Sequence, residues 1–184
     1  MIDQDVEPRP WAAPKRRHLY CIPRRVVRRE PWVPGGRTLH LIDIENLMGG
    51  PLQGLEALHS ACRVYRELVG LRPHDHVVVA CNSALAMPAG LAWHKSRILV
   101  GNGPDGADIA LLGQLKDLEW TASRYDRVVV GSGDGIFAKA VRGLTQLGIP
   151  VGVTSRPHAL AYLLASAATF VVFLPETPVE GAVA

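Results

Sequence analysis

The chain has 184 residues, of which 48% are hydrophobic. This length and composition suit one globular domain with a sizeable core, because most domains contain about 100 to 150 residues. No apolar run approaches the roughly 18 to 20 residues of a membrane-spanning helix, and the acidic start lacks the order of a signal peptide. We therefore expect a cytoplasmic protein with no membrane partner. Its three isolated cysteines predict neither a disulfide framework nor a CxxC metal site.

The net charge of +3 is distributed unevenly. Residues 1–37 contain nine Lys or Arg against four Asp or Glu, whereas the rest contains eleven against thirteen. Because this proline-rich segment shows no sustained apolar periodicity, we expect an extended basic arm that attracts a polyanion such as RNA. Its Trp11, Tyr20 and Trp32 are compatible with stacking on bases, with anchoring on the body, and with contacting a second subunit in a homodimer.

Between residues 38 and 174, apolar strands alternate with amphipathic helices. Strands are expected at 38–43, 76–82, 97–101, 126–134, 150–155 and 169–174, and helices at 55–68, 105–120, 137–147 and 157–167, with a weak helix or loop at 84–93. This alternation predicts an α/β fold with three layers (α/β/α) and a mainly parallel sheet. Residues 175–184 are read as a short C-terminal tail.

Three aspartates fall where strands end. Asp43 closes the first strand, Asp108 lies in the first helical turn after the third, and Asp134 follows the fourth. Because parallel strands deliver their carboxyl ends to one edge of the sheet, these acids are expected to converge there. Clustered carboxylates repel one another unless a hard cation neutralises them, and Mg²⁺ or Mn²⁺ suits oxygen ligands. Such an ion supports phosphodiester hydrolysis.

Each acid also has a structural explanation, because aspartate is favoured at helix N-termini and at turns. Asp105, in Pro-Asp-Gly before a helix, is as well placed to be an N-cap as to be a further metal ligand. Asn46, one turn past Asp43, is suited to orient a water or a carboxylate, and Glu45 is a second-rank candidate. Ser132 and the amides that follow it are candidate phosphate contacts.

The segments LIDIENL, GPDGADIALL and VVVGSGDGIFAKAV together resemble the NYN family of PIN-like nucleases over residues 38–174. The resemblance matches Asp43 and Asn46 to the first motif and Asp108 to the second. It matches Ser132, Gly133, Asp134 and Phe137 to the third. It implies a PIN-like (Rossmann-like) topology and a magnesium- or manganese-dependent ribonuclease without a nucleotide cofactor. Asp43, Asp108 and Asp134 would be its metal ligands, with Asn46 beside them.

The chain departs from that family at two acidic positions, which Ile136 and Gln114 occupy, and Asp105 replaces a lysine of the second motif. These departures put a two-metal arrangement in doubt. They leave open an alternative function, that of a catalytically weakened PIN-like module that binds RNA or has a regulatory role.

Basic groups at His94, Lys95 and Arg156 are further candidates for an RNA path. A haloacid-dehalogenase-like phosphatase fits poorly, because Glu45 stands where its second aspartate is required. A dinucleotide-binding oxidoreductase is disfavoured because no GxGxxG turn follows the first strand.

Overall fold

The protein is described by a computed structural model that covers residues 36–49 and 54–175. These residues contain one six-stranded sheet in the order β3-β2-β1-β4-β5-β6, and every neighbouring pair of strands is parallel. The strands are β1 (Thr38–Asp43), β2 (His76–Cys81), β3 (Arg97–Val100), β4 (Arg127–Gly131), β5 (Val151–Ser155) and β6 (Phe170–Phe173). The expected α/β fold with a parallel sheet is confirmed. The predicted arm up to residue 35 and the tail from residue 176 lie outside the described residues.

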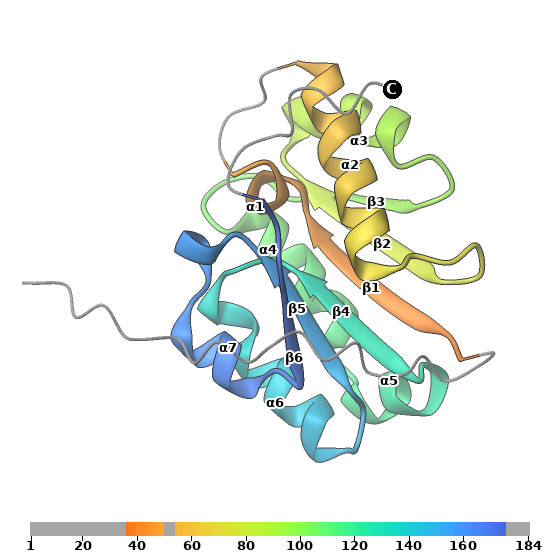
Figure 1. Cartoon of the computed structure of the whole chain (residues 1–184), viewed down its shortest axis with the longest axis vertical. Coiled ribbons are helices and arrows are strands. Elements are labelled where there is room, and N and C mark those ends of the chain that lie inside the picture. The colour runs from red at the N-terminus through yellow and green to blue at the C-terminus, as the bar shows by residue number, and fades with distance from the viewer. Residues whose placement is uncertain (1–35, 50–53, 176–184) are drawn as a thin grey trace, which may run out of the picture.

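Helices cover both faces of the sheet, which gives the three expected layers (Figure 1). One face packs against α1 (Ile44–Met48), α2 (Leu55–Val69) and α3 (Ala86–Ala92). The other packs against α4 (Gly106–Leu112), α5 (Leu118–Arg124), α6 (Ala138–Gln146) and α7 (Tyr162–Ala167). Side chains alternate across the sheet, so Leu41 faces the second layer of helices and Ile42 the first. Within the described ranges, no helix is long and apolar enough to cross a membrane.

The helix predicted at 105–120 is in fact two helices. α4 ends at Leu112, a 3-10 turn follows at Gly113–Leu115, and α5 begins at Leu118. The break occurs because Asp117 is extended, and its carboxylate accepts a 2.8 Å hydrogen bond from the Trp120 amide. This N-cap starts a new helix.

The first strand leads directly into α1, a helix that the sequence did not predict. Asp43 caps it by accepting a hydrogen bond from the Glu45 amide, and Gly49 ends it in the left-handed conformation with φ of 69°. The remaining short 3-10 turns lie at Ser83–Leu85, Gly135–Phe137 and Pro157–Ala159.

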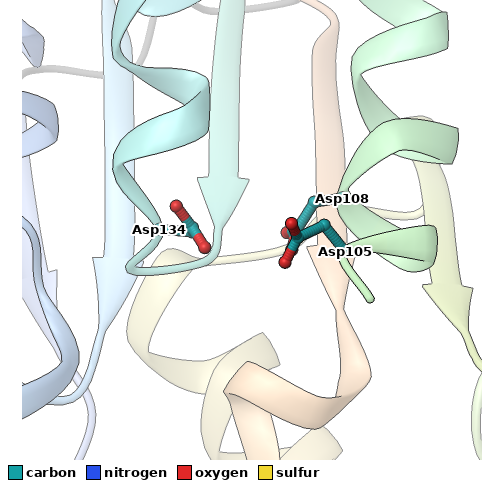
Figure 2. A group of neighbouring side chains, drawn as sticks. All are labelled: Asp105, Asp108 and Asp134. Carbon is teal, nitrogen blue, oxygen red and sulfur yellow. The ribbon is translucent and has the colours of Figure 1, made fainter. Parts of the chain in front are cut away.

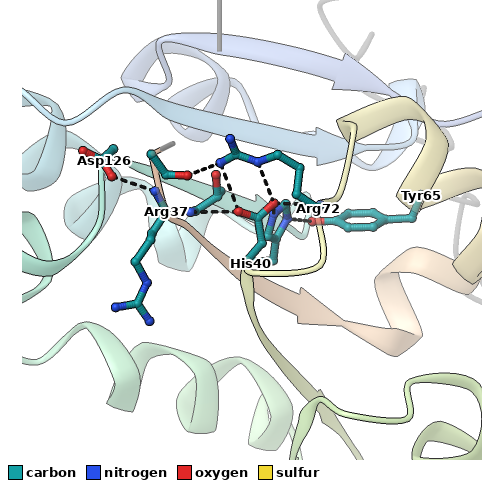
Figure 3. A network of polar contacts seen from close by, with 8 residues as sticks. Arg37, His40, Tyr65, Arg72 and Asp126 are labelled. Carbon is teal, nitrogen blue, oxygen red and sulfur yellow. Dashed lines mark hydrogen bonds and ion pairs between the residues drawn. The ribbon is translucent and has the colours of Figure 1, made fainter. Parts of the chain in front are cut away.

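A buried polar network ties β1 to its neighbours at the amino ends of the strands (Figure 3). His40 is fully buried, with Nδ1 3.0 Å from the Tyr65 hydroxyl and Nε2 3.6 Å from the Asp75 carboxylate. Burial alone would raise the pKa of Asp75, but hydrogen bonds from His40, Arg72 and Thr38 hold this pKa well below its usual range. Burial lowers the pKa of His40. The network thus fixes the sheet edge opposite the candidate site.

Candidate metal centre

The strand order places two remote segments side by side at the middle of the sheet. β1 pairs with β4, while the chain continues from β1 toward β2 and β3 on one side and from β4 toward β5 and β6 on the other. Such a point, where the strand order reverses, opens a crevice beyond the carboxyl ends of the strands. Asp43 is the last residue of β1, and Asp134 lies in the turn that follows β4. Both predicted acids therefore lie at this point of the sheet.

Three carboxylates converge there (Figure 2). One oxygen from each of Asp105, Asp108 and Asp134 lies within 4.8 Å of the others. Asp105 and Asp108 come from the start of α4, and Asp134 comes from the turn after β4 (Figure 2). Asp108 is 8% exposed, whereas the other two are open to solvent. This arrangement joins one buried and two accessible carboxylates.

Asp105 belongs to this group through an unusual backbone conformation. Its φ is 56°, in the left-handed region that aspartate tolerates better than most residues, and its side chain makes no N-cap hydrogen bond with α4. Gly101 and Gly106 allow the preceding turn to close tightly, because a Cβ at Gly106 would lie 2.6 Å from the carbonyl carbon of Gly101. Of the two roles predicted for Asp105, the capping bond is absent and the carboxylate lies beside Asp108.

Asp43 and Asp134 do make the capping contacts that the structural explanation predicts. Oδ1 of Asp43 accepts from the Glu45 amide at 3.0 Å, and Oδ1 of Asp134 accepts from the Ile136 amide at 2.9 Å. A carboxylate has two oxygens and several lone pairs, so one cap bond does not use up its capacity. Capping therefore fixes both side chains without excluding them as ligands.

The acids disturb one another electrostatically. Burial, together with the charges of Glu45 and Asp134, raises the pKa of Asp43 to about 6. Burial also raises the pKa of Asp108 to about 7, with further contributions from Asp43, Asp134 and Asp105. Asp43 lies outside the group with oxygens within 4.8 Å, but it shares the field of that group. Bringing these carboxylates together is costly unless a proton or a cation neutralises them.

Two buried oxygens beside the acids lack a hydrogen-bond partner within the described part of the chain. They are Oδ1 of Asp108 and Oδ1 of Asn46. A buried polar oxygen without a partner is costly, and native proteins usually provide one. Their position at the carboxylate edge is what a site that binds an ion and its water would require.

Asn82 is an additional polar residue at this edge that sequence reasoning missed. Glu45 accepts hydrogen bonds from the Asn82 backbone amide at 3.2 Å and from Nδ2 at 2.7 Å, which joins α1 to the end of β2. The available signal was its position immediately after the buried strand HVVVAC.

Two of the predicted phosphate contacts are buried instead. Ser132 is fully buried, and its Oγ accepts a hydrogen bond from the Asp134 amide at 3.2 Å. Arg156 is 6% exposed and donates to the carbonyls of Leu47 at 3.3 Å, Met48 at 3.1 Å and Pro175 at 2.6 Å. Both side chains hold the backbone around the site, and their burial does not favour contact with RNA.

His94 and Lys95 lie at the amino ends of the strands, away from the carboxylates. They precede β3, and in a parallel sheet the residues before a strand lie opposite the carboxyl ends. Gln114 also points away from the acids, because its Oε1 accepts from Arg97 at the amino end of β3 over 3.2 Å. Ile136 does lie beside Asp134 and is 38% exposed. Of the two acidic positions where the chain departs from the NYN family, only Ile136 adjoins the carboxylate group.

No protein-family model and no curated protein matches this chain. Among solved structures, the crystal structure of a protein of unknown function from Vibrio parahaemolyticus is similar, with a TM-score of 0.55 and 18% sequence identity. The match covers 77% of this chain and 94% of that chain. At this identity the likeness concerns the fold alone, and the resemblance to the NYN family stays a prediction.

Proposed function

We propose that this protein is a divalent-metal-dependent endoribonuclease that hydrolyses RNA phosphodiester bonds at Asp43, Asp108 and Asp134, with Asp105 completing the acidic group. The observation that carries the proposal is the convergence of three carboxylate oxygens within 4.8 Å where the strand order reverses. The choice of RNA rather than another phosphodiester rests on the motif resemblance, because a fold does not determine a substrate.

The residues present fit Mg²⁺ or Mn²⁺. All of the candidate ligands are oxygens, which hard cations prefer, and Asp108 carries a buried oxygen without a hydrogen-bond partner among the described residues. The raised pKa values of Asp43 and Asp108, which come mainly from burial, support a site that added positive charge would stabilise. When bound, such an ion lowers the pKa of a coordinated water and offsets negative charge on the phosphate.

The protein groups around this position have distinct roles in the proposal. Asp105, Asp108 and Asp134 hold the cation. Asp43, fixed by its bond to the Glu45 amide, adds negative charge from the end of β1. Asn46 orients the attacking water through its buried Oδ1, which needs a hydrogen-bond donor.

The second candidate function is that of a PIN-like module that binds RNA or has a regulatory role but does not cleave RNA. Ile136 favours it, because an apolar side chain stands beside Asp134 where NYN relatives carry an acid. The two candidates differ in whether metal addition produces RNA cleavage.

Cleavage of a fluorescently labelled RNA in Mg²⁺, in Mn²⁺ and in EDTA tests the proposal. Asp134→Asn keeps an oxygen for the Ile136 amide but removes the charge, so we expect at least an approximately 100-fold loss of rate. Asp117→Asn is the matched control, because Asp117 is also an exposed aspartate that caps a helix, but it is outside the carboxylate group. RNA binding without cleavage in either metal would overturn the enzyme and favour the module. Equal rates for wild type and Asp134→Asn would show that the activity does not depend on this carboxylate and would contradict the proposed site.

A further inference from the structure

The sheet edge opposite the carboxylates carries a cluster of exposed basic and aromatic side chains. Arg37 precedes β1, His76 and Arg97 begin β2 and β3, and Arg124 ends α5 just before β4. Trp120, on α5, is 51% exposed. We call Arg37, His76, Arg97, Trp120 and Arg124 the amino-edge patch. It occupies the amino ends of the strands, whereas the acids occupy the carboxyl ends.

Contacts among these side chains hold the patch together around Tyr125. The Arg37 guanidinium lies 5.8 Å from the centre of the Tyr125 ring, and the Arg124 guanidinium lies 5.4 Å from that of Trp120. The two rings meet edge to face at 6.4 Å, and His76 Nδ1 lies 2.5 Å from the Tyr125 hydroxyl. Tyr125 itself is buried, so Trp120 is the ring that solvent reaches.

Positive charge dominates this surface. Burial lowers the pKa of His76, and the charges of Arg37, Arg124 and Arg97 lower it further, so all three arginines act on one point. Two exposed acids lie nearby: Asp126, whose carboxylate accepts from the Arg37 backbone amide at 2.6 Å, and Glu119 on α5. Asp75 is buried beneath and already engaged with Arg72.

We propose that the amino-edge patch binds single-stranded RNA, with its arginines on phosphates and a base stacked on Trp120. The identity of the ligand rests on the proposed function. Exposed aromatic rings among arginines suit single strands, because every base has a face that can stack. The acidic edge repels phosphates, so a nuclease of this shape needs a separate cationic surface to hold its substrate.

Two other segments of the chain adjoin this patch: the basic residues 1–35 and strand β3. Residues 1–35, with eight Lys or Arg against four Asp or Glu, are joined to the fold at Gly36, next to Arg37. In the other direction, β3 runs from Arg97 to Val100, and Asp105 follows five residues after the end of this four-residue strand. A strand of that length spans about 13 Å. The length of β3 is therefore within the reach of a short oligonucleotide.

Binding of a fluorescein-labelled oligouridylate to the full chain in EDTA tests the proposal, because no cleavage occurs without metal. Arg97→Gln/Arg124→Gln should weaken binding on the order of tenfold and reduce the slope of log K against log salt by about 1.4, which is 0.7 per phosphate. Trp120→Ala should weaken binding about tenfold with little change in that slope. Arg63→Gln/Arg142→Gln removes two exposed arginines from α2 and α6 and is the charge-matched control.

The outcomes separate the patch from the nuclease. If the Arg97/Arg124 variant binds with the affinity and salt slope of the control, the patch proposal is wrong, whether or not the wild type cuts RNA. If Trp120→Ala binds as the wild type does, base stacking is wrong. If binding depends on the patch but no protein cleaves RNA in Mn²⁺, the patch stands and the proposed function fails. Circular dichroism and thermal unfolding confirm that each variant is folded.

Discussion

Replacing Asp108 with asparagine should stabilise the metal-free protein at pH 8 and remove its stabilisation by metal. The pKa of Asp108 is raised from 3.8 to about 7, mainly by burial and then by Asp43, Asp134 and Asp105. An acid whose pKa is higher in the folded state binds its proton more tightly there, so stability is present at low pH and is lost as pH rises from about 4 through 7. Asparagine cannot ionise and does not incur this loss.

The size of the effect follows from the shift. Each pKa unit corresponds to about 1.4 kcal/mol, so a rise of about three units bounds the cost of ionising Asp108 at about 4 kcal/mol. Two neighbouring acids are open to solvent, which screens the repulsion, and we expect about 2 kcal/mol. For a domain of this size, that amounts to about 4 to 8 °C in Tm.

Thermal unfolding in EDTA between pH 5 and 8.5 measures this difference. The Tm of Asp108→Asn minus that of wild type should rise with pH through about 7. Taking the difference removes the contribution of His40, whose lowered pKa makes stability fall in the opposite direction, as pH decreases. Manganese at 100 times its Kd should then add about 2.7 kcal/mol to the wild type and much less to the variant.

Two results would refute this reasoning. One is a pH-independent difference, which would mean that Asp108 ionises without penalty. The other is equal stabilisation of wild type and variant by manganese, which would place the ion elsewhere. Glu67→Gln, which removes an exposed acid on α2, is the control and should follow the wild type in both experiments.

Two further substitutions test how the site is supported. Arg156→Met should lower the free energy of unfolding in urea by about 2 to 4 kcal/mol, because three backbone carbonyls lose their hydrogen-bond donor. The control Arg142→Met, at an exposed arginine, should lower it little. Equal unfolding midpoints for the two variants would contradict a supporting role of Arg156. Gly133→Ala should destabilise the fold by about 1 to 3 kcal/mol and weaken manganese binding, because its Cβ would lie 2.3 Å from the Ala159 carbonyl oxygen. Gly135→Ala is the control, because its Cβ would make only an ordinary contact at 3.4 Å. Equal manganese affinities of the two alanine variants would show that the turn tolerates the Cβ at position 133.

The strands and their parallel arrangement were predictable because each buried strand is a short, nearly continuous apolar run between helices. The division between α4 and α5 was not predictable from apolar spacing. Leu111 and Leu115 pack into one core and Leu118 lies against it, so the apolar pattern continues across the break. The local signs of the break were Gly113, which follows the first helix, and Asp117, which caps the second. Periodicity reports which side is buried and does not detect a turn that keeps the same side buried.

The positions of Asp43, Asp108 and Asp134 were predictable to the level of the edge, because topology alone decides where a strand ends. Which carboxylate oxygens come closest to one another was not predictable from the sequence. Asp105 joins the group through a left-handed residue, a conformation that spacing does not reveal. The burial of Arg156 was equally hidden. A Cβ at Gly49 would lie 2.2 Å from the Arg156 Nε, so this contact depends on a glycine more than 100 positions away.

Many charged side chains of the described residues are divided between the two ends of the strands, and this division connects the two proposals. Five acids end a strand or follow one: Asp43, Glu45, Asp105, Asp108 and Asp134. Exposed arginines precede or begin strands on the other side. A polyanion approaching such a protein is drawn to the basic edge and repelled from the acidic one. A cation at the carboxylates removes that repulsion locally, so the same ion that supports hydrolysis would also admit the phosphate to the site. Under the two proposals, metal dependence would then act on substrate access as well as on chemistry.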